Sequence, residues 1–361
     1  MQSPVNLTGL SNIRWLFMPT QFNAQFRLSK VGQSRYNKHS QFSENHLKGS
    51  GSMALGQLAN QIGLMFVLML VGVLINKLGF MQTQTSNDLT NILLYIVSPC
   101  LIIGAFEQHY SASRMKQLVL VCIGIFIFYI IEIIVSKLAF GRISNINLRR
   151  ITQYGSIYSN AGFMGVPLTS ALFGNSGVFF AVASLAGFNI FSWTHGVSLF
   201  KTGQKTTDRW QNFREIIVNP NIIAILIGLI FFLFSFQLPG PANEVVKYIS
   251  SINTPLSMIV IGNSLGNIKL NRQLIDWHLW LALFFRNVLF PIIAIMVLQL
   301  LTVSGVALYT TVLMAACPAA GLVVLFTLQA YGDTSPAVAL MSLSTILSLI
   351  TIPLVFALIK L

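Results

Sequence analysis

The fold of this chain is decided by one stretch, which reads Tyr154-Gly155-Ser156-Ile157-Tyr158-Ser159-Asn160-Ala161-Gly162-Phe163-Met164-Gly165-Val166-Pro167-Leu168. The stretch lies in an apolar block, but its glycines, its proline and its asparagine make a poor helix. Pro167 cannot donate to the carbonyl of Phe163, and it disfavours helical geometry at Val166. The stretch therefore predicts a membrane helix that breaks at Pro167.

A second stretch of the same kind reads Ala315-Ala316-Cys317-Pro318-Ala319-Ala320-Gly321, and its Pro318 frees the carbonyl of Met314. Free backbone groups are tolerated at membrane depth only where protein or water satisfies them, so two such breaks can cross at the midplane. The half-helix N-termini would then offer N–H groups to an anion, and small residues such as Gly165 and Ala319 would allow close approach. The alternative is a pair of kinked helices packed through small residues.

The composition excludes most soluble classes of protein. Hydrophobic residues make up 54% of the 361 residues and charged residues only 9%, against about 25% in an average soluble domain. The basic side chains are spread between apolar blocks and form no patch, so we expect no nucleic-acid partner. Three cysteines without a CxxC spacing and five isolated histidines predict neither a disulfide framework nor a metal site, and no nucleotide motif implies a cofactor.

The apolar blocks predict an all-α membrane protein with ten transmembrane helices. The longest polar connector, 201–215, divides them into a first five-helix repeat in 53–200 and a second in 216–361, and we expect it to be cytoplasmic. The predicted spans are 58–78, 86–106, 115–138, 150–173, 177–200, 216–236, 243–265, 277–302, 306–330 and 335–359.

The basic residues set the predicted orientation. Loops after the odd-numbered spans hold eleven Lys and Arg and the opposite side holds four, so the richer side should be cytoplasmic. An odd number of spans per half gives the two halves opposite orientations. Prolines recur at matching places, Pro99 with Pro255 and Pro167 with Pro318, which favours the inverted repeat of a secondary transporter over the ordinary occurrence of proline in membrane helices.

Residues 1–52 do not match the rest of the chain. They form a basic, serine-containing leader with a single acid, Glu44, and no apolar core long enough for a secretory signal. An organellar transit peptide fits this composition, and so does a start assigned too far upstream. We favour Met53 as the true start, and we expect 1–52 not to be part of the fold.

Four polar residues within the predicted spans are candidates for function. Glu132 and Arg286 are costly at membrane depth, so a role in coupling or in charge balance is the default, and the two could pair. Snorkelling towards the membrane edge is the alternative for Glu132, and anchoring of freed carbonyls is the alternative for Arg286. Asn160 and Asn189 each need a partner, either a ligand or another helix.

Several ordered stretches resemble the auxin efflux carrier family, which includes the plant carriers and bacterial permeases for malate and malonate. The matching pieces span about 58–361, and residues 1–52 have no counterpart. They are Asn160 to Leu168, Asn219-Pro220-Asn221 through Ile227-Gly228-Leu229, Pro255-Leu256-Ser257-Met258 through Gly262, Cys317-Pro318 through Tyr331-Gly332, Ser344-Thr345-Ile346-Leu347 and Ile352-Pro353-Leu354.

The resemblance implies a five-plus-five inverted repeat, broken fourth and ninth helices that cross near the midplane, and an elevator-type motion against a dimerising scaffold. It matches the family's crossover asparagine to Asn160, its crossover prolines to Pro167 and Pro318, and a polar position of the fifth helix to Asn189. Ala319 stands where the plant carriers have a polar residue, which argues against an indole acid. The short 201–215 connector is similar to that of the bacterial members.

From the residues and the resemblance we expect a secondary-active or facilitative permease for a small organic anion such as malate, in the plasma membrane and as a homodimer. Its expected substrate-binding residues are Asn160, Gly165, Pro167, Asn189, Pro318 and Ala319. A sodium-coupled symporter of bile-acid type and a non-transporting sensor are the alternatives. No catalytic motif is present, so we do not expect an enzyme.

Overall fold

The computed structural model describes residues 51–200, 214, 217–266 and 276–359, which belong to one compact unit, 49–361. Every regular element in these residues is a helix, and the only β-type pairing among them joins Ser159 to Ala319. The prediction of an all-α protein is confirmed. The predicted leader and the predicted linker, 1–52 and 201–215, fall almost wholly outside the described residues.

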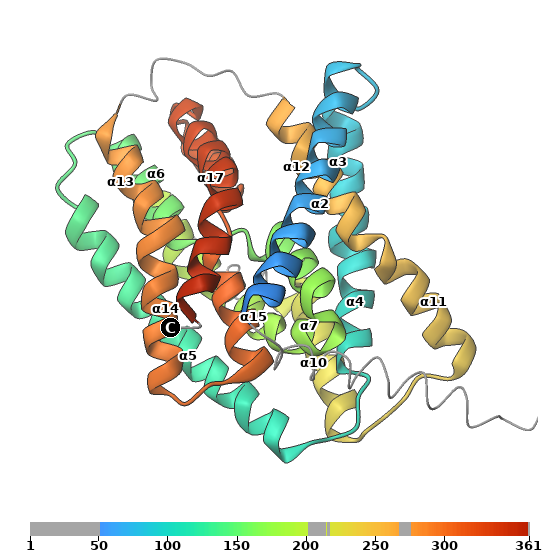
Figure 1. Ribbon diagram of the computed structural model, residues 1–361. Coiled ribbons are helices and arrows are strands. Elements are labelled where there is room, and N and C mark those ends of the chain that lie inside the picture. Colours follow the sequence, from blue (N-terminus) through green and yellow to red (C-terminus); the bar gives the residue numbers. More distant parts are fainter. Residues whose placement is uncertain (1–50, 201–213, 215–216, 267–275, 360–361) are drawn as a thin grey trace, which may run out of the picture. The chain divides into compact units, whose positions relative to one another are not determined.

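The helices follow one another along the chain as Figure 1 labels them. Their bounds are α2 Gly51–Lys77, α3 Thr83–Ile92, η1 Leu93–Val97, α4 Ser98–Phe106, α5 Ala112–Phe140, α6 Ile146–Ile157, η2 Ala161–Gly165, α7 Val166–Phe191, η3 Ser192–Gly196, α8 Val197–Phe200, α10 Pro220–Leu233, α11 Gly240–Ser251, α12 Asn253–Gly266, α13 Trp277–Phe284, η5 Phe285–Leu289, α14 Phe290–Leu300, α15 Gly305–Ala316, α16 Leu322–Gln329 and α17 Ser335–Ile359.

Seven helical stretches of the described residues are long and apolar enough to cross a membrane. Two shorter apolar helices, α10 and α15, accompany them. Large apolar side chains stay exposed along the spans, as on a surface that faces lipid; Leu70, Leu300 and Ile350 are 60%, 84% and 64% exposed. The seven spans are Asn60–Lys77, Gln84–Phe106, Ala112–Phe140, Ala161–Phe200, Gly240–Gly266, Trp277–Leu300 and Ser335–Ile359.

The helices α2 and α12 pack with their backbones in direct contact, and Figure 1 shows them side by side. A Cβ atom added at Gly72 would collide with the carbonyl oxygen of Ile259, and one added at Gly262 would collide with that of Met69. Only glycine allows this approach, since each obstacle is backbone and cannot move aside. The first and the second half of the chain are joined here by a glycine-to-backbone contact.

Three prolines follow a wide helical turn instead of breaking the helix. The π-helices η1, η2 and η5 each end two residues before a proline, Pro99, Pro167 and Pro291 respectively. Each wide turn closes by an i to i+5 hydrogen bond, which takes up the helix where the proline lacks its donor and crowds the carbonyl four residues back. Pro167 therefore lies near the start of α7 in helical geometry, and the sequence prediction of a break at Pro167 was wrong in position.

Candidate functional site

Two helical segments end abruptly and lie against each other at their ends. α6 ends at Ile157 and η2 begins at Ala161, while α15 ends at Ala316 and α16 begins at Leu322. The N–H of Asn160 donates to the carbonyl of Pro318 at 2.7 Å, and the N–H of Ala320 donates to the carbonyl of Tyr158 at 2.8 Å. The interrupted backbone thus satisfies part of its own hydrogen bonding by pairing the two breaks.

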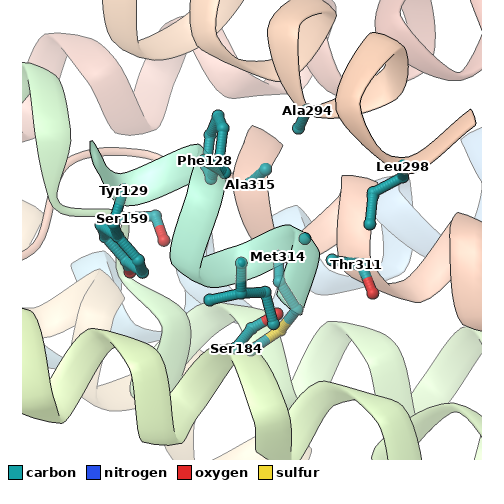
Figure 2. A pocket seen from close by; sticks show the side chains of 11 residues that line it. Phe128, Tyr129, Ser159, Ser184, Ala294, Leu298, Thr311, Met314 and Ala315 are labelled. Atoms are coloured by element: carbon teal, nitrogen blue, oxygen red, sulfur yellow. The ribbon is translucent and has the colours of Figure 1, made fainter. Parts of the chain in front are cut away.

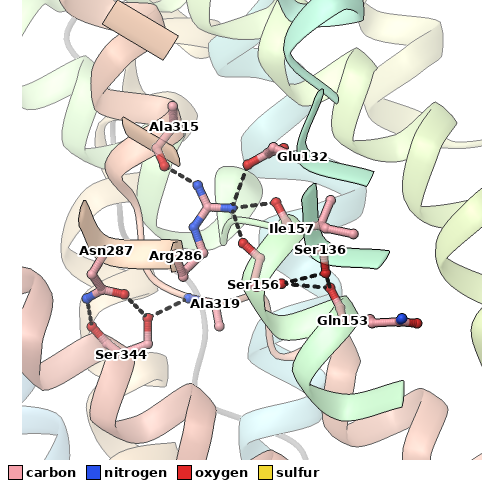
Figure 3. A network of polar contacts seen from close by, with 10 residues as sticks. All are labelled: Glu132, Ser136, Gln153, Ser156, Ile157, Arg286, Asn287, Ala315, Ala319 and Ser344. Carbon is pink, nitrogen blue, oxygen red and sulfur yellow. Dashed lines mark hydrogen bonds and ion pairs between the residues drawn. The ribbon is translucent and has the colours of Figure 1, made fainter. Parts of the chain in front are cut away.

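Arg286 supplies the donors that the ends of α6 and α15 lack. It lies on η5, it is 1% exposed, and its guanidinium donates to the carbonyl of Ser156 at 3.1 Å. It also donates to the carbonyls of Ile157 and Ala315, so one side chain reaches both breaks, as Figure 3 shows. The last carbonyls of a helix have no partner within the helix, and the fork of a guanidinium can serve several at once.

Glu132 balances the charge of Arg286. Its Oε1 lies 3.4 Å from the Arg286 Nη1, and both side chains are almost fully buried, 0% and 1% exposed. The pairing considered from the sequence is therefore present, and Glu132 does not reach the membrane edge. Glu132 Oε2 and Arg286 Nε have no hydrogen-bond partner in the described residues. Of the two roles considered for Arg286, the contacts are those of a carbonyl anchor.

A second polar group supports the other side of the break and escaped the sequence reasoning. The N–H of Ala319 donates to the Ser344 hydroxyl at 3.0 Å, and that hydroxyl donates to Asn287 Oδ1 at 2.6 Å. Asn287 Nδ2 donates to the carbonyl of Ser344 at 2.9 Å (Figure 3). An Asn directly after a buried Arg was a usable signal for Asn287, whereas a single Ser in an apolar helix gives none.

The predicted substrate residues divide into those at the breaks and one elsewhere. Asn160 is half-buried, and its side-chain oxygen accepts the N–H of Phe163 at 3.3 Å. Pro318 and Ala319 are buried in the pairing itself, and a Cβ at Gly165 would lie 2.6 Å from Met314 Sδ on α15.

The other two predicted residues belong to α7. The Pro167 carbonyl accepts from the Thr254 hydroxyl of α12 at 3.2 Å. Asn189 is buried, and its amide nitrogen has no hydrogen-bond partner in the described residues. No hydrogen bond among the described residues links Asn189 to the paired breaks, so the contacts do not bring it into the same cluster.

A small cavity adjoins the breaks, lined by Ser159, Ala315 and Met314 together with Tyr129 and Thr311, as Figure 2 shows. Its volume of about 20 Å³ leaves room for roughly one water molecule, so it cannot hold an organic substrate in this conformation. None of the six predicted substrate residues lines it.

Comparison with known proteins adds a family. The family model described as membrane transport protein matches residues 60–356. An uncharacterized transporter of Methanothermobacter thermautotrophicus is 27% identical over 299 residues, which cover 80% of this chain and 94% of that relative. The uncharacterized transporter MJ1031 of Methanocaldococcus jannaschii is 24% identical over 247 residues, which cover 67% of this chain and 79% of the relative. Both names state transport and neither states a substrate.

Proposed function

This chain belongs to the membrane transport protein family, the auxin efflux carrier-like family, and on that basis we propose that it carries a small organic anion, such as the dicarboxylate malate, across the plasma membrane. It is a multi-pass membrane transporter. The substrate class is supported by the two paired breaks, because the balance of partial charges around them favours a negative ligand.

The charge balance follows from which backbone groups have partners. The carbonyls that end α6 and α15 are bound by Arg286, so the negative ends of these helices are neutralised. The helices that begin after the breaks, η2 and α16, have no acidic residue in their first turn. Their leading N–H groups have no intrahelical acceptor and keep their partial positive charge. A carboxylate beside Asn160 would accept from such groups.

The helix lengths support ten spans. The continuous helical stretch Ala161–Phe200 has 40 residues and would extend about 60 Å, roughly twice the thickness of the hydrocarbon core. Gly174 interrupts it with φ 56° and ψ −153°, a conformation open to glycine, so the stretch can turn back as two spans. Counting α6 with η2, and α15 with α16, as single broken spans then gives five spans on each side of the 201–215 connector. The inverted repeat, the elevator motion and the homodimer stay predictions.

The sodium-coupled alternative is less well supported. Sodium binds converging oxygen atoms, and the break carbonyls that would provide them, those of Ser156, Ile157 and Ala315, already accept from Arg286. A cation would have to displace a buried guanidinium that is itself positively charged.

The test is uptake of radiolabelled malate into proteoliposomes, with and without an imposed pH gradient. We expect saturable uptake by the wild-type protein, and loss of uptake in Asn160→Ala at near-normal protein abundance. The matched control is Asn91→Ala, which changes an exposed asparagine of α3 and should transport normally.

Two results would contradict the proposal. Equal loss of uptake and abundance in Asn160→Ala would give Asn160 a structural role only. No saturable malate uptake by folded wild-type protein would remove malate, and competition by monocarboxylates, malonate and indole acids would then be measured to find the substrate.

A further inference from the structure

We propose that a cavity at the C-terminal end of α5, about 310 Å³ in volume, is a binding site for carboxylate anions that collects the substrate on the Lys/Arg-rich side. This inference rests on the proposed function and adds a second site to it. The cavity is large enough for a small organic acid, at the lower end of the range of roughly 300–1,000 Å³ for small-molecule sites.

Three nitrogen-bearing side chains converge on this cavity from three different elements. Lys137 comes from α5, Arg149 from α6 and His195 from η3. No Asp or Glu is among the residues that line it. A recess lined by one sign of charge, with apolar walls such as Ile133 and Leu199, concentrates the field and attracts small ions of the opposite sign.

Two further side chains give the cavity hydrogen-bonding groups. Gln153 is 8% exposed, and Figure 3 shows its side chain pointing away from Arg286. No hydrogen bond of its side-chain amide occurs within the described residues. Ser136 is fully buried, with its hydroxyl 3.0 Å from that of Ser156. An amide that is largely withdrawn from water needs a partner, and a carboxylate in the cavity would provide one.

The inner wall of the cavity is built from the break itself. Ile157 lines it, and the carbonyl of Ile157 accepts from Arg286. His195 Nδ1 lies 2.9 Å from the Tyr158 hydroxyl, which donates to the carbonyl of Phe191 at 2.9 Å. Because that hydroxyl has one proton, His195 Nδ1–H donates to it, which leaves Nε2 available. An anion held here would lie next to the residues that form the paired breaks.

The positive-inside rule explains basic residues at this membrane side but does not explain their convergence. Arg142 and Arg150 belong to the same part of the chain and do not line the cavity. Arg149 and Arg150 are adjacent and both half-buried, so replacing either one changes the loop charge equally. This pair separates a cavity effect from a topological one.

The first experiment measures malate uptake kinetics in proteoliposomes. We expect Arg149→Gln and Lys137→Gln each to raise KM by about tenfold with Vmax within about twofold of wild type, the effect of losing one charge-assisted contact in substrate binding. Arg150→Gln and Arg142→Gln should keep the wild-type KM. An unchanged KM in Arg149→Gln, or an equal rise in Arg150→Gln, would overturn the inference.

The second experiment has a readout that does not need transport. Gln153→Cys is modified in purified protein with an anionic and with a cationic methanethiosulfonate, and the wild-type chain gives the background from Cys100, Cys122 and Cys317. We expect the anionic-to-cationic rate ratio to exceed that at the exposed Ser144→Cys by about tenfold, and to fall when Arg149→Gln is added.

The two experiments keep the two proposals distinguishable. Equal rate ratios at Gln153→Cys and Ser144→Cys would overturn the anion site even if malate is transported. A high ratio at Gln153→Cys that Arg149→Gln lowers would support the anion site even if the wild-type protein does not take up malate, which would count against the proposed substrate alone.

Discussion

Arg286 is the residue on which the geometry of both breaks depends. Its guanidinium donates to carbonyls at the ends of α6 and α15, which belong to different halves of the chain, and Glu132 neutralises it. A lysine is a compact point charge, whereas the planar guanidinium presents five donors in a fixed fork. The arginine can therefore serve several oxygens that a lysine at the same place could not reach together.

Replacing Arg286 should destabilise the protein more than it weakens substrate binding. Arg286→Gln leaves the Glu132 carboxylate buried and unpaired and removes the donors of three carbonyls, so we expect a loss of roughly 3–5 kcal/mol in stability. Thermal unfolding in detergent, followed by fluorescence-detected size exclusion, measures this loss. Arg142→Gln, at an exposed position, is the control and should unfold at the wild-type temperature. An Arg286→Gln protein that is as stable as wild type but no longer stabilised by malate would instead mean that Arg286 balances the substrate charge.

At this scale the sequence predicted which residues are special better than what they do. Glu132 and Arg286 were identifiable because a charge is costly within a membrane span. Asn287 and Ser344 were not identified, because their importance depends on the N–H of Ala319, which comes near only in the folded chain. The role of Arg286 likewise depends on carbonyls that the primary sequence does not bring together.

At the scale of the elements, apolar blocks predicted most helices and local chemistry predicted the breaks less well. Block edges at 335–359 and 277–302 agree closely with Ser335–Ile359 and Trp277–Leu300, because the length of an apolar run is a property of the sequence itself. The second break coincides with Pro318. The first lies at Ser159 and Asn160 instead of Pro167, because a π-turn accommodates that proline.

The contact between α2 and α12 gives a prediction for helix packing. Gly72→Ala and Gly262→Ala each place a methyl group against a backbone carbonyl, so we expect about 1–3 kcal/mol or more of destabilisation. Gly63→Ala on the same helix is the control: nothing lies within 4 Å of its added Cβ, and alanine favours a helix over glycine. Thermal unfolding in detergent compares the three. Equal stability of Gly262→Ala and Gly63→Ala would mean that the two helices are not in backbone contact.

At the scale of the whole molecule, the distribution of basic residues predicts the orientation in the membrane. Of the connections between described spans, the one that follows α5 carries Lys137, Arg142, Arg149 and Arg150, while the one that precedes α5 carries Arg114 and Lys116. A charged excess of this kind retains a loop in the cytoplasm. The carboxylate site proposed at the end of α5 would then open to the cytoplasm.

Two isosteric replacements test this orientation. Ser113→Cys lies at the start of α5 and Ser144→Cys lies just beyond its end, and both serines are exposed. We expect a membrane-impermeant thiol reagent to label Ser113→Cys in intact cells and Ser144→Cys only after the cells are permeabilised. The unaltered chain gives the background from its own thiols. The reverse labelling pattern would show that the basic side faces outwards.

The hydrogen bonds of Arg286 also constrain the order in which the chain can mature during synthesis. The carbonyls of Ser156 and Ile157 receive their donor from a residue 130 and 129 positions further along. Until that residue has been translated and inserted, α6 ends in oxygens that hydrocarbon cannot satisfy, at a cost of several kcal/mol each. The segment Ile146–Ile157 must therefore remain at the lipid headgroups or within the translocon while the ribosome completes most of the second half. The N-terminal half would not mature alone, and a ribosome stalled before Arg286 would leave a nascent chain exposed to membrane quality control.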